Sequence, residues 1–288
     1  MKENSGILWI TGAGSGLGME SAIFLASRGF RVFGSVLTEA EADVLKSAAS
    51  ERGVSIEILR TDVTRPEEIE SSLQQIVAAA GTLDGLIQFA GMGLRGFFED
   101  LTLEEIRRVF DVNLFGMMAV TRAVLPLMRK AKRGRIILTS SVGGRMGSMS
   151  IGGYSSSKFA VEGFGECLRQ EMAPFNVQVS LLEPGLIYTP HFTVNRNRAR
   201  GAMDAGSPYY SWFCRHEKLV DDILRRNRFG APEVARTVFE ILTARRPRLR
   251  YLVGAKAKLV VNLRRYLPGE LFERVYWAMV RRVVTRPG

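Results

Sequence analysis

The sequence alternates short apolar runs with longer segments of helical periodicity from residue 7 to about residue 183. This rhythm is typical of parallel βαβ units, and near-continuous apolar strands suit a sheet that helices cover on both faces. The pattern predicts strands at 7–11, 31–36, 54–59, 85–89, 135–139, 177–182 and near 251–253, and helices at 16–27, 39–51, 67–80, 103–130, 152–173 and after Pro232. We therefore expect an α/β protein with a doubly wound parallel sheet of the Rossmann type.

The domain boundaries are predicted from the position at which the alternation of apolar runs and helical segments ends. The 288 residues are enough for one large core, and residues 1–255 are predicted to form a single domain. The pattern ends after Pro184 in a polar, glycine-dotted stretch, so residues 186–230 are predicted to be a variable substrate loop that acts as a lid or a binding segment. Residues 256–288 are predicted to be a helical C-terminal extension.

The net charge of +11 is concentrated in the C-terminal segment. Residues 245–288 hold twelve Lys and Arg against Glu270 and Glu273, a net charge of +10. From Leu271 onward apolar residues recur at helical spacing, which fits either an interfacial helix on anionic lipid or a helix packed on the domain or across a subunit interface. The first reading implies peripheral membrane contact. No recognised nucleic-acid-binding motif accompanies the cluster, and no nucleic-acid partner is expected.

Several classes of protein are disfavoured by what the sequence lacks. Cys167 and Cys214 form no metal-ligand spacing and no disulfide framework, so no metal site is predicted. There is no GxxxxGK[ST] motif of an NTPase and no GxSxG elbow of a hydrolase. The first residues lack the pattern of a secretory signal, and no 18 consecutive apolar residues occur, so we expect a cytoplasmic protein.

A glycine-rich run, residues 11–18, joins the first predicted strand to the first predicted helix. Glycines allow a tight turn that brings backbone N–H groups against a pyrophosphate, and the helix N-terminus adds partial positive charge. This context predicts dinucleotide binding. The second strand ends at Ser35, Val36 and Leu37, without the acid that holds ribose hydroxyls or the arginine that takes a 2′-phosphate. NAD and NADP both stay open.

Tyr154 and Lys158 stand four residues apart at the start of a predicted helix, so their side chains share one face. A phenol with a pKa of about 10 becomes a useful base near neutral pH only when a neighbouring positive charge lowers that pKa. Ser141 follows the fifth strand, at the sheet edge where ligands bind, and its hydroxyl could donate to a substrate oxygen. Alone, the Tyr and Lys would also fit a plain surface pair.

Together these motifs resemble the short-chain dehydrogenase/reductase family over roughly residues 5–190. The resemblance adds Asp62 and Val63 near the adenine, Asn113 in a helix, and Pro184 to Thr189 around the nicotinamide. It implies Asn113, Ser141, Tyr154 and Lys158 as catalytic residues. It implies cofactor contacts from Gly12, Ser15, Gly16, Leu17, Gly18, Asp62, Val63, Ala90, Gly91, Tyr154, Lys158, Pro184, Gly185, Ile187 and Thr189.

The resemblance also implies roles. Tyr154 would be the acid/base, Lys158 would lower its pKa and bind the ribose, Ser141 would orient the carbonyl, and Asn113 would hold a relay water. One motif departs: Gln88-Phe89-Ala90-Gly91 stands where the family usually has Asn-Asn-Ala-Gly, which puts the local stability of the sheet in doubt.

The segments around Ser141 and Lys158 look like those of the branch that acts on steroids and retinoids. We therefore expect an NAD(P)-dependent oxidoreductase for a bulky apolar secondary alcohol or ketone of steroid, retinoid or polyketide type, forming a homodimer or homotetramer. The alternative is a catalytically silent dinucleotide-binding sensor or scaffold protein.

Overall fold

A seven-stranded, fully parallel sheet forms the centre of the protein, seen in a computed structural model that describes residues 6–187, 196–226 and 230–284. The strand order is β3-β2-β1-β4-β5-β6-β7. The strands are β1 (Ile7–Thr11), β2 (Arg31–Val36), β3 (Glu57–Arg60), β4 (Gly85–Gln88), β5 (Gly134–Thr139), β6 (Val177–Pro184) and β7 (Arg250–Val253). The order reverses between β1 and β4, so a ligand cleft is expected at their carboxyl ends.

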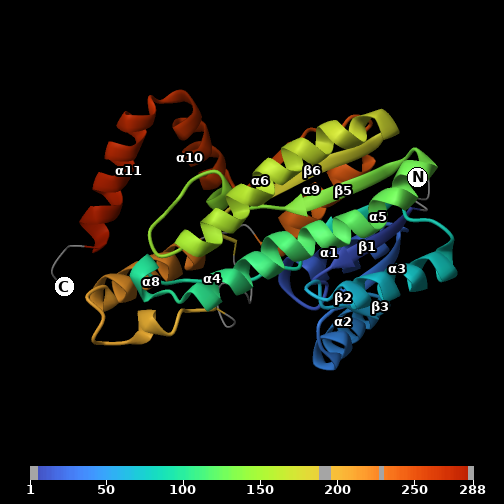
Figure 1. Ribbon diagram of the computed structural model, residues 1–288, viewed down its shortest axis with the longest axis horizontal. Helices are drawn as coiled ribbons and strands as arrows, with labels where there is room; N and C mark the ends of the chain where they lie inside the picture. Colours follow the sequence, from blue (N-terminus) through green and yellow to red (C-terminus); the bar gives the residue numbers. More distant parts are fainter. Residues whose placement is uncertain (1–5, 188–195, 227–229, 285–288) are drawn as a thin grey trace.

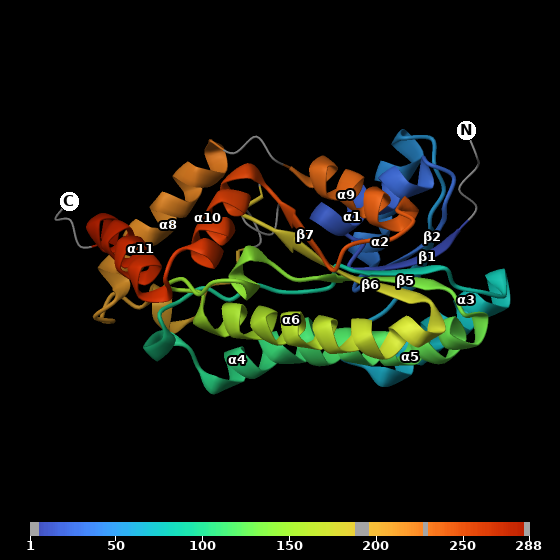
Figure 2. The ribbon, with the colours of Figure 1, turned by 90° about the horizontal axis from the view of Figure 1, so that it is seen from above.

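Helices cover both faces of this sheet (Figures 1 and 2). One layer holds α1 (Gly16–Ala26), α2 (Glu39–Glu51) and α9 (Ala231–Thr243). The other holds α3 (Pro66–Ala80), α4 (Leu103–Phe110), α5 (Met117–Ala131) and α6 (Gly152–Met172). Strand β1 shows why each face has its own core: Trp9 faces one hydrophobic cluster while Leu8 and Ile10 face the other, as the two-residue period of a strand requires. The predicted doubly wound architecture is confirmed.

Some predicted boundaries were wrong. Strand β3 begins at Glu57 rather than residue 54, and β6 continues to Pro184. The predicted helix 103–130 is divided by a π-helical turn, η2 (Asp111–Gly116). Taken together, Leu103–Ala131 is long and apolar enough to cross a membrane, but Val109, Val120 and other side chains of it are buried in the protein core, as in an ordinary core helix.

The segment predicted as a lid loop contains a helix, α8 (Tyr210–Arg225), which the polar composition concealed. Few of its apolar side chains, among them Phe213 and Val220, are buried, and half of its residues are polar or charged. Short 3-10 turns complete the described chain: η1 (Phe98–Asp100), η3 (Val142–Gly144), η4 (Ala173–Phe175) and η5 (Gly201–Met203). After β7 the extension forms α10 (Ala255–Tyr266) and α11 (Gly269–Val284), which lie at the same end of the molecule as α8 (Figure 1).

Candidate active site

At two positions of the glycine-rich turn, close contacts with neighbouring backbone leave no room for a side chain. Gly12 has a φ of +68° and Gly16 a φ of +54°, a region that favours glycine. A Cβ on Gly12 would lie 2.6 Å from the backbone nitrogen of Ala90, and a Cβ on Gly18 would overlap the carbonyl oxygen of Gly12. The turn therefore sits directly against the exit of β4, and α1 starts close behind it with free N–H groups suited to a pyrophosphate.

A cleft of about 900 Å³ runs from this turn across the carboxyl edge of the sheet. Its lining includes most of the predicted cofactor residues: Gly12, Ser15, Gly16, Leu17, Gly18, Asp62, Val63, Ala90, Gly91, Tyr154, Lys158, Pro184 and Gly185. Ile187 is buried in the core with Val234 and Tyr251 instead and does not line the cleft. Thr189 lies outside the described residues.

Tyr154, Ser141 and Lys158 converge at the far end of the cleft. The Ser141 hydroxyl lies beside the Tyr154 phenol, accepts from the Gly143 N–H at 3.0 Å and donates to the Pro184 carbonyl at 3.5 Å. Lys158 donates from Nζ to the carbonyl oxygen of Thr139 at 2.9 Å, and Nζ lies 5.8 Å from the centre of the Tyr154 ring. The four-residue spacing on α6 thus places the phenol and the amine on one face, as predicted.

Burial moves the pKa values of both groups toward their neutral forms. Burial raises the pKa of the Tyr154 phenol, and the neighbouring Ser141 hydroxyl opposes that shift. Burial also lowers the pKa of Lys158 to about 8, against the attraction of Glu162. At neutral pH the side chains of this chain alone therefore keep Tyr154 protonated and leave Lys158 mostly charged.

Asn113 lies behind the cleft, fully buried in the π-helical turn. Its Oδ1 accepts from the N–H of Met92 at 2.8 Å, while its Nδ2 donates to the Met92 carbonyl at 2.9 Å and to Ser157 Oγ at 3.1 Å. The wide turn points this side chain inward, and such turns are frequent at functional sites. Asn113 therefore fastens the Gly91–Met92 segment to α6 within reach of Lys158.

Gln88 compensates for the unusual Gln-Phe-Ala-Gly segment. Its Nε2 donates to Thr121 Oγ1 at 2.7 Å and to the Met117 carbonyl at 3.1 Å, which ties β4 to α5. Phe89 contributes an apolar side chain to the core under α1 and α9, and its N–H donates to Thr11 at 3.0 Å. The hydrogen bonds of the Gln88 side chain thus strengthen the sheet at the point where it was expected to be weak.

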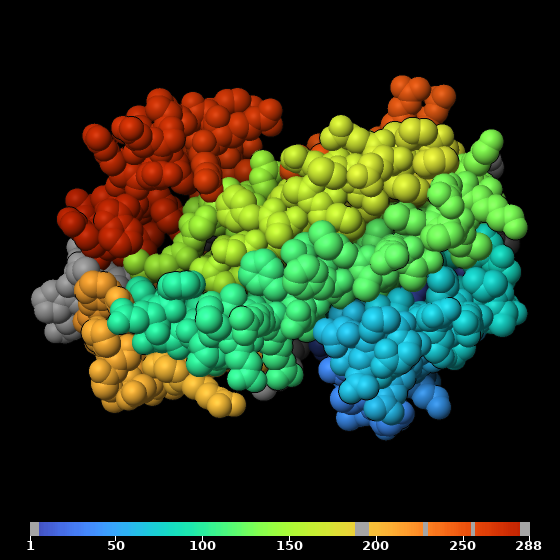
Figure 3. Space-filling model, viewed as in Figure 1, coloured from blue at the N-terminus to red at the C-terminus, as the bar shows by residue number. Residues whose placement is uncertain are grey.

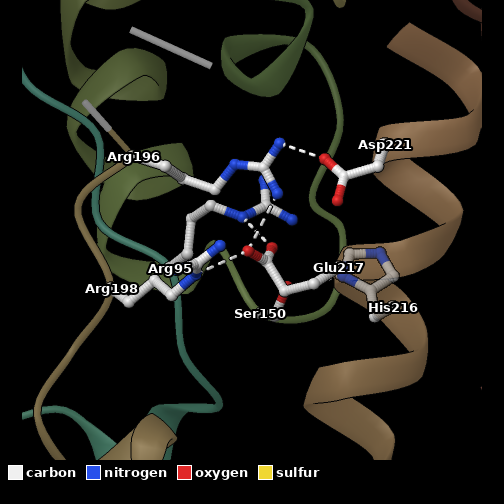
Figure 4. A network of polar contacts seen from close by, with 7 residues as sticks. All are labelled: Arg95, Ser150, Arg196, Arg198, His216, Glu217 and Asp221. Carbon is white, nitrogen blue, oxygen red and sulfur yellow. Dashed lines mark hydrogen bonds and ion pairs between the residues drawn. The ribbon is translucent and has the colours of Figure 1, made fainter. Parts of the chain in front are cut away.

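A buried ion network beside the cleft went unnoticed in the sequence (Figure 4). Arg95, which follows β4, and Arg196 and Arg198, which follow β6, all pair with Glu217 of α8. Asp221, one turn further along α8, also binds Arg196. Although burial alone would raise it, these guanidinium groups hold the pKa of Glu217 below its ordinary value. The i, i+4 pair of acids on α8 was the one sequence signal available.

His216 stands next to this network on the same helix. Its Nδ1 lies 2.8 Å from Ser150 Oγ, and burial together with nearby Arg95 lowers its pKa to about 4. Neutral His216 and the ion network hold α8 against the segments that follow β4, β5 and β6 (Figure 4).

Residues 7–200 match the family model for short chain dehydrogenases. The chain belongs to the short-chain dehydrogenase family. It is 35% identical to 3-ketodihydrosphingosine reductase of Bacteroides thetaiotaomicron over 95% of this chain and 98% of that protein. It is 36% identical to human retinol dehydrogenase 5 over 94% of this chain and 88% of that protein.

The fold is similarly close to solved structures of the family. A short-chain dehydrogenase/reductase from Burkholderia phymatum in complex with NAD is 25% identical, with a TM-score of 0.80 over 100% of this chain and 99% of that one. Structural neighbours hold NAD or NADPH, and this member of the short-chain dehydrogenase family is an NAD(P)-dependent oxidoreductase. The glycine cradle, which any Cβ at positions 12 or 18 would fill, fits such a dinucleotide.

Proposed function

We propose that this oxidoreductase interconverts a bulky apolar secondary alcohol and its ketone, with Tyr154 as the proton-transfer group. The supporting observation is that Tyr154 and Lys158 both line the cleft that begins at the glycine turn, with the Ser141 hydroxyl beside the phenol. The dinucleotide, when bound, donates or accepts the hydride. The chain's own side chains then have to hold the substrate oxygen and move one proton.

Each side chain has a role consistent with its contacts. The protonated Tyr154 phenol donates to a carbonyl oxygen in reduction and takes the proton back in oxidation. Ser141, aligned by the Gly143 N–H, donates a second hydrogen bond to that oxygen. The Lys158 ammonium favours the phenolate form of Tyr154 and offers its remaining protons to ribose hydroxyls. Asn113 acts as a positioning residue for the Gly91–Met92 segment and for a water next to Lys158.

The cofactor contacts follow the lining of the cleft. Gly12 to Gly18 would hold the pyrophosphate, Asp62 and Val63 the adenine, and Pro184 and Gly185 the nicotinamide. Asp62 is suited to this because its Oδ1 accepts from both the N–H and the hydroxyl of Thr64, which fixes its orientation. Thr189 and Ile187 stay predictions from family resemblance.

An apolar substrate of steroid, retinoid or polyketide type is supported by the named relatives. The relatives are named for retinol and for 3-ketodihydrosphingosine, both with long apolar chains. We further propose a cytoplasmic homodimer or homotetramer that contacts membranes through residues 256–288.

Replacing Tyr154 with Phe tests this proposal and the silent-sensor alternative together. Turnover of ketones should fall by about 10²- to 10⁴-fold, because the proton donor is gone, while dinucleotide affinity stays within a factor of about two. A panel of apolar ketones and alcohols is followed by absorbance of reduced nicotinamide, with NAD and NADP in separate assays. Tyr266→Phe, an exposed phenol on α10, is the matched control.

Two outcomes would count against the proposal. Unchanged turnover in Tyr154→Phe would remove Tyr154 from the mechanism. Tight dinucleotide binding by the unaltered chain without turnover of any member of the panel would favour the sensor or scaffold alternative.

A further inference from the structure

The two C-terminal helices each use one side to pack on the domain. On α10, Val261 is buried and Arg264 lies over the ring of Phe159 and donates to the Arg145 carbonyl. On α11, Phe272 and Val280 are buried, with Tyr276 between them donating to Ser148 Oγ at 3.0 Å. Packing on the domain, one of the two readings of the sequence, therefore accounts for one side of each helix.

Apolar side chains spaced three or four residues apart occupy another side of each helix, exposed to solvent. They are Leu259, Leu263 and Tyr266 on α10 and Leu271, Val275 and Met279 on α11, each between 43% and 76% exposed. Trp277 on α11 is also about half exposed, at 53%. We call the first six residues the apolar stripes. Stripes of this size at one end of a molecule indicate a contact surface.

Basic residues border these stripes. The described helices α10 and α11 carry seven Lys and Arg against Glu270 and Glu273, a net charge of +5. Arg265, Arg274 and Arg282 are exposed. The helices form a separate lobe beside α6 and α8 (Figure 3), so both charge and apolar surface are accessible on one projecting part of the molecule.

The lobe adjoins the proposed active site at two points. Ala257 in the first turn of α10 lies against Gly185, whose hypothetical Cβ would be 2.9 Å from the Ala257 Cβ, and Gly185 lines the cleft. Helix α11 packs on the lid helix α8. A partner held by the lobe is thus held next to the cleft and its lid.

We propose that α10 and α11 form a docking surface for an anionic lipid bilayer, with the apolar stripes inserted between headgroups and the bordering arginines on the lipid phosphates. Amphipathic helices with arginines beside an apolar face bind membranes in this way. A second copy of the chain is a poorer occupant, because a two-fold interface would oppose two surfaces that each carry +5. The proposal rests on the proposed function in one respect: an apolar substrate would enter from the bilayer beside the cleft.

Vesicle co-sedimentation with the full chain tests the surface. The protein should bind vesicles of phosphatidylcholine and phosphatidylglycerol and should bind vesicles of pure phosphatidylcholine weakly. Each basic residue near an anionic surface strengthens binding by about fivefold, so Arg265→Gln, Arg274→Gln, Arg282→Gln together should weaken it about 100-fold. Replacing Leu271, Val275 and Met279 with Ser should weaken it by a similar order.

The matched control replaces three exposed apolar residues elsewhere, Val44, Val77 and Leu103, with Ser and should leave vesicle binding unchanged. Absence of binding to anionic vesicles, or equal loss in the control, overturns the proposal. So does a stripe variant that keeps vesicle binding but falls to a smaller oligomer by light scattering, which would make the stripes a subunit interface. Vesicle binding needs neither dinucleotide nor turnover, so its failure leaves the oxidoreductase function intact, and loss of turnover leaves the docking surface intact.

Discussion

The dinucleotide end of the cleft and the lid end are built in different ways. At the dinucleotide end, glycine is required at positions 12 and 18 by close backbone contacts, from Gly12 to Ala90 and from Gly18 to Gly12. At the lid end, Arg95 meets Glu217, 122 residues away, in a buried ion network. The first region depends on the shape of the backbone, whereas the second depends on charges that have to be paired once they are buried.

This difference predicts that the two ends fail separately. Damage to the ion network should loosen the lid and spare dinucleotide binding, because none of its residues lines the glycine turn. Changes beside the glycine turn should alter the choice of dinucleotide and spare the lid.

The largest effect is expected for Glu217→Gln. The substitution keeps the shape but leaves Arg95 and Arg196, both nearly fully buried, without their shared carboxylate. Removing one partner of a buried ion pair costs about 3–5 kcal/mol, so urea unfolding should shift by that amount and proteolysis within residues 196–226 should accelerate. Asp221→Asn is the control: the Asp221 carboxylate is 42% exposed, so its loss should cost under about 1 kcal/mol. Comparable losses in the two variants would mean that Glu217 does not organise the lid.

A smaller effect is expected from acid acting on His216. Its folded pKa is about 4, below the ordinary value of 6.5, so the unfolded state gains a proton first and stability falls as pH drops below 6.5. By pH 5 the loss should reach about 2 kcal/mol, seen as faster hydrogen exchange in α8. His216→Asn keeps a hydrogen-bonding side chain opposite Ser150 without the titration and should flatten this dependence. Equal acid sensitivity in the variant would assign the effect to other groups.

The smallest effect is expected at Glu41. Its Oε2 accepts from the Leu37 N–H at 2.8 Å, so the carboxylate is fixed in the cleft wall where β2 ends. A 2′-phosphate there would meet a like charge, and we expect NAD to bind more tightly than NADP. Glu41→Gln should reduce this discrimination by about tenfold, or about 1.4 kcal/mol, as measured by titration of protein fluorescence with each reduced dinucleotide. Glu39→Gln, on an exposed part of α2, should change nothing; a preference for NADP in the unaltered chain would contradict the prediction.

The same contrast explains how much the sequence could predict. The strands, the glycine turn and the Tyr154 and Lys158 pair depend on short-range spacing, and the structure places them as expected. The role of Glu41 could not be predicted from the sequence, because its carboxylate reaches back across the first turn of α2 to the end of β2. The residues of the strand end itself, 35–37, give no sign of this contact. Helix α8 and the Arg95 network depend on residues far apart in the chain, and no local pattern joins Arg95 to Glu217.

The π-helical turn at Asp111–Gly116 constrains how this protein can tolerate change in chain length. Because such a turn carries one residue more than an α-helical turn, deleting a single residue there would let the helix become regular. Because the wide turn absorbs the extra residue within one turn, such a deletion would leave α4 and α5 in similar register but would move Asn113 away from Met92 and Ser157. A related chain that lacks this residue should therefore be unable to place an asparagine where Asn113 lies, and should hold the segment after β4 by other bonds.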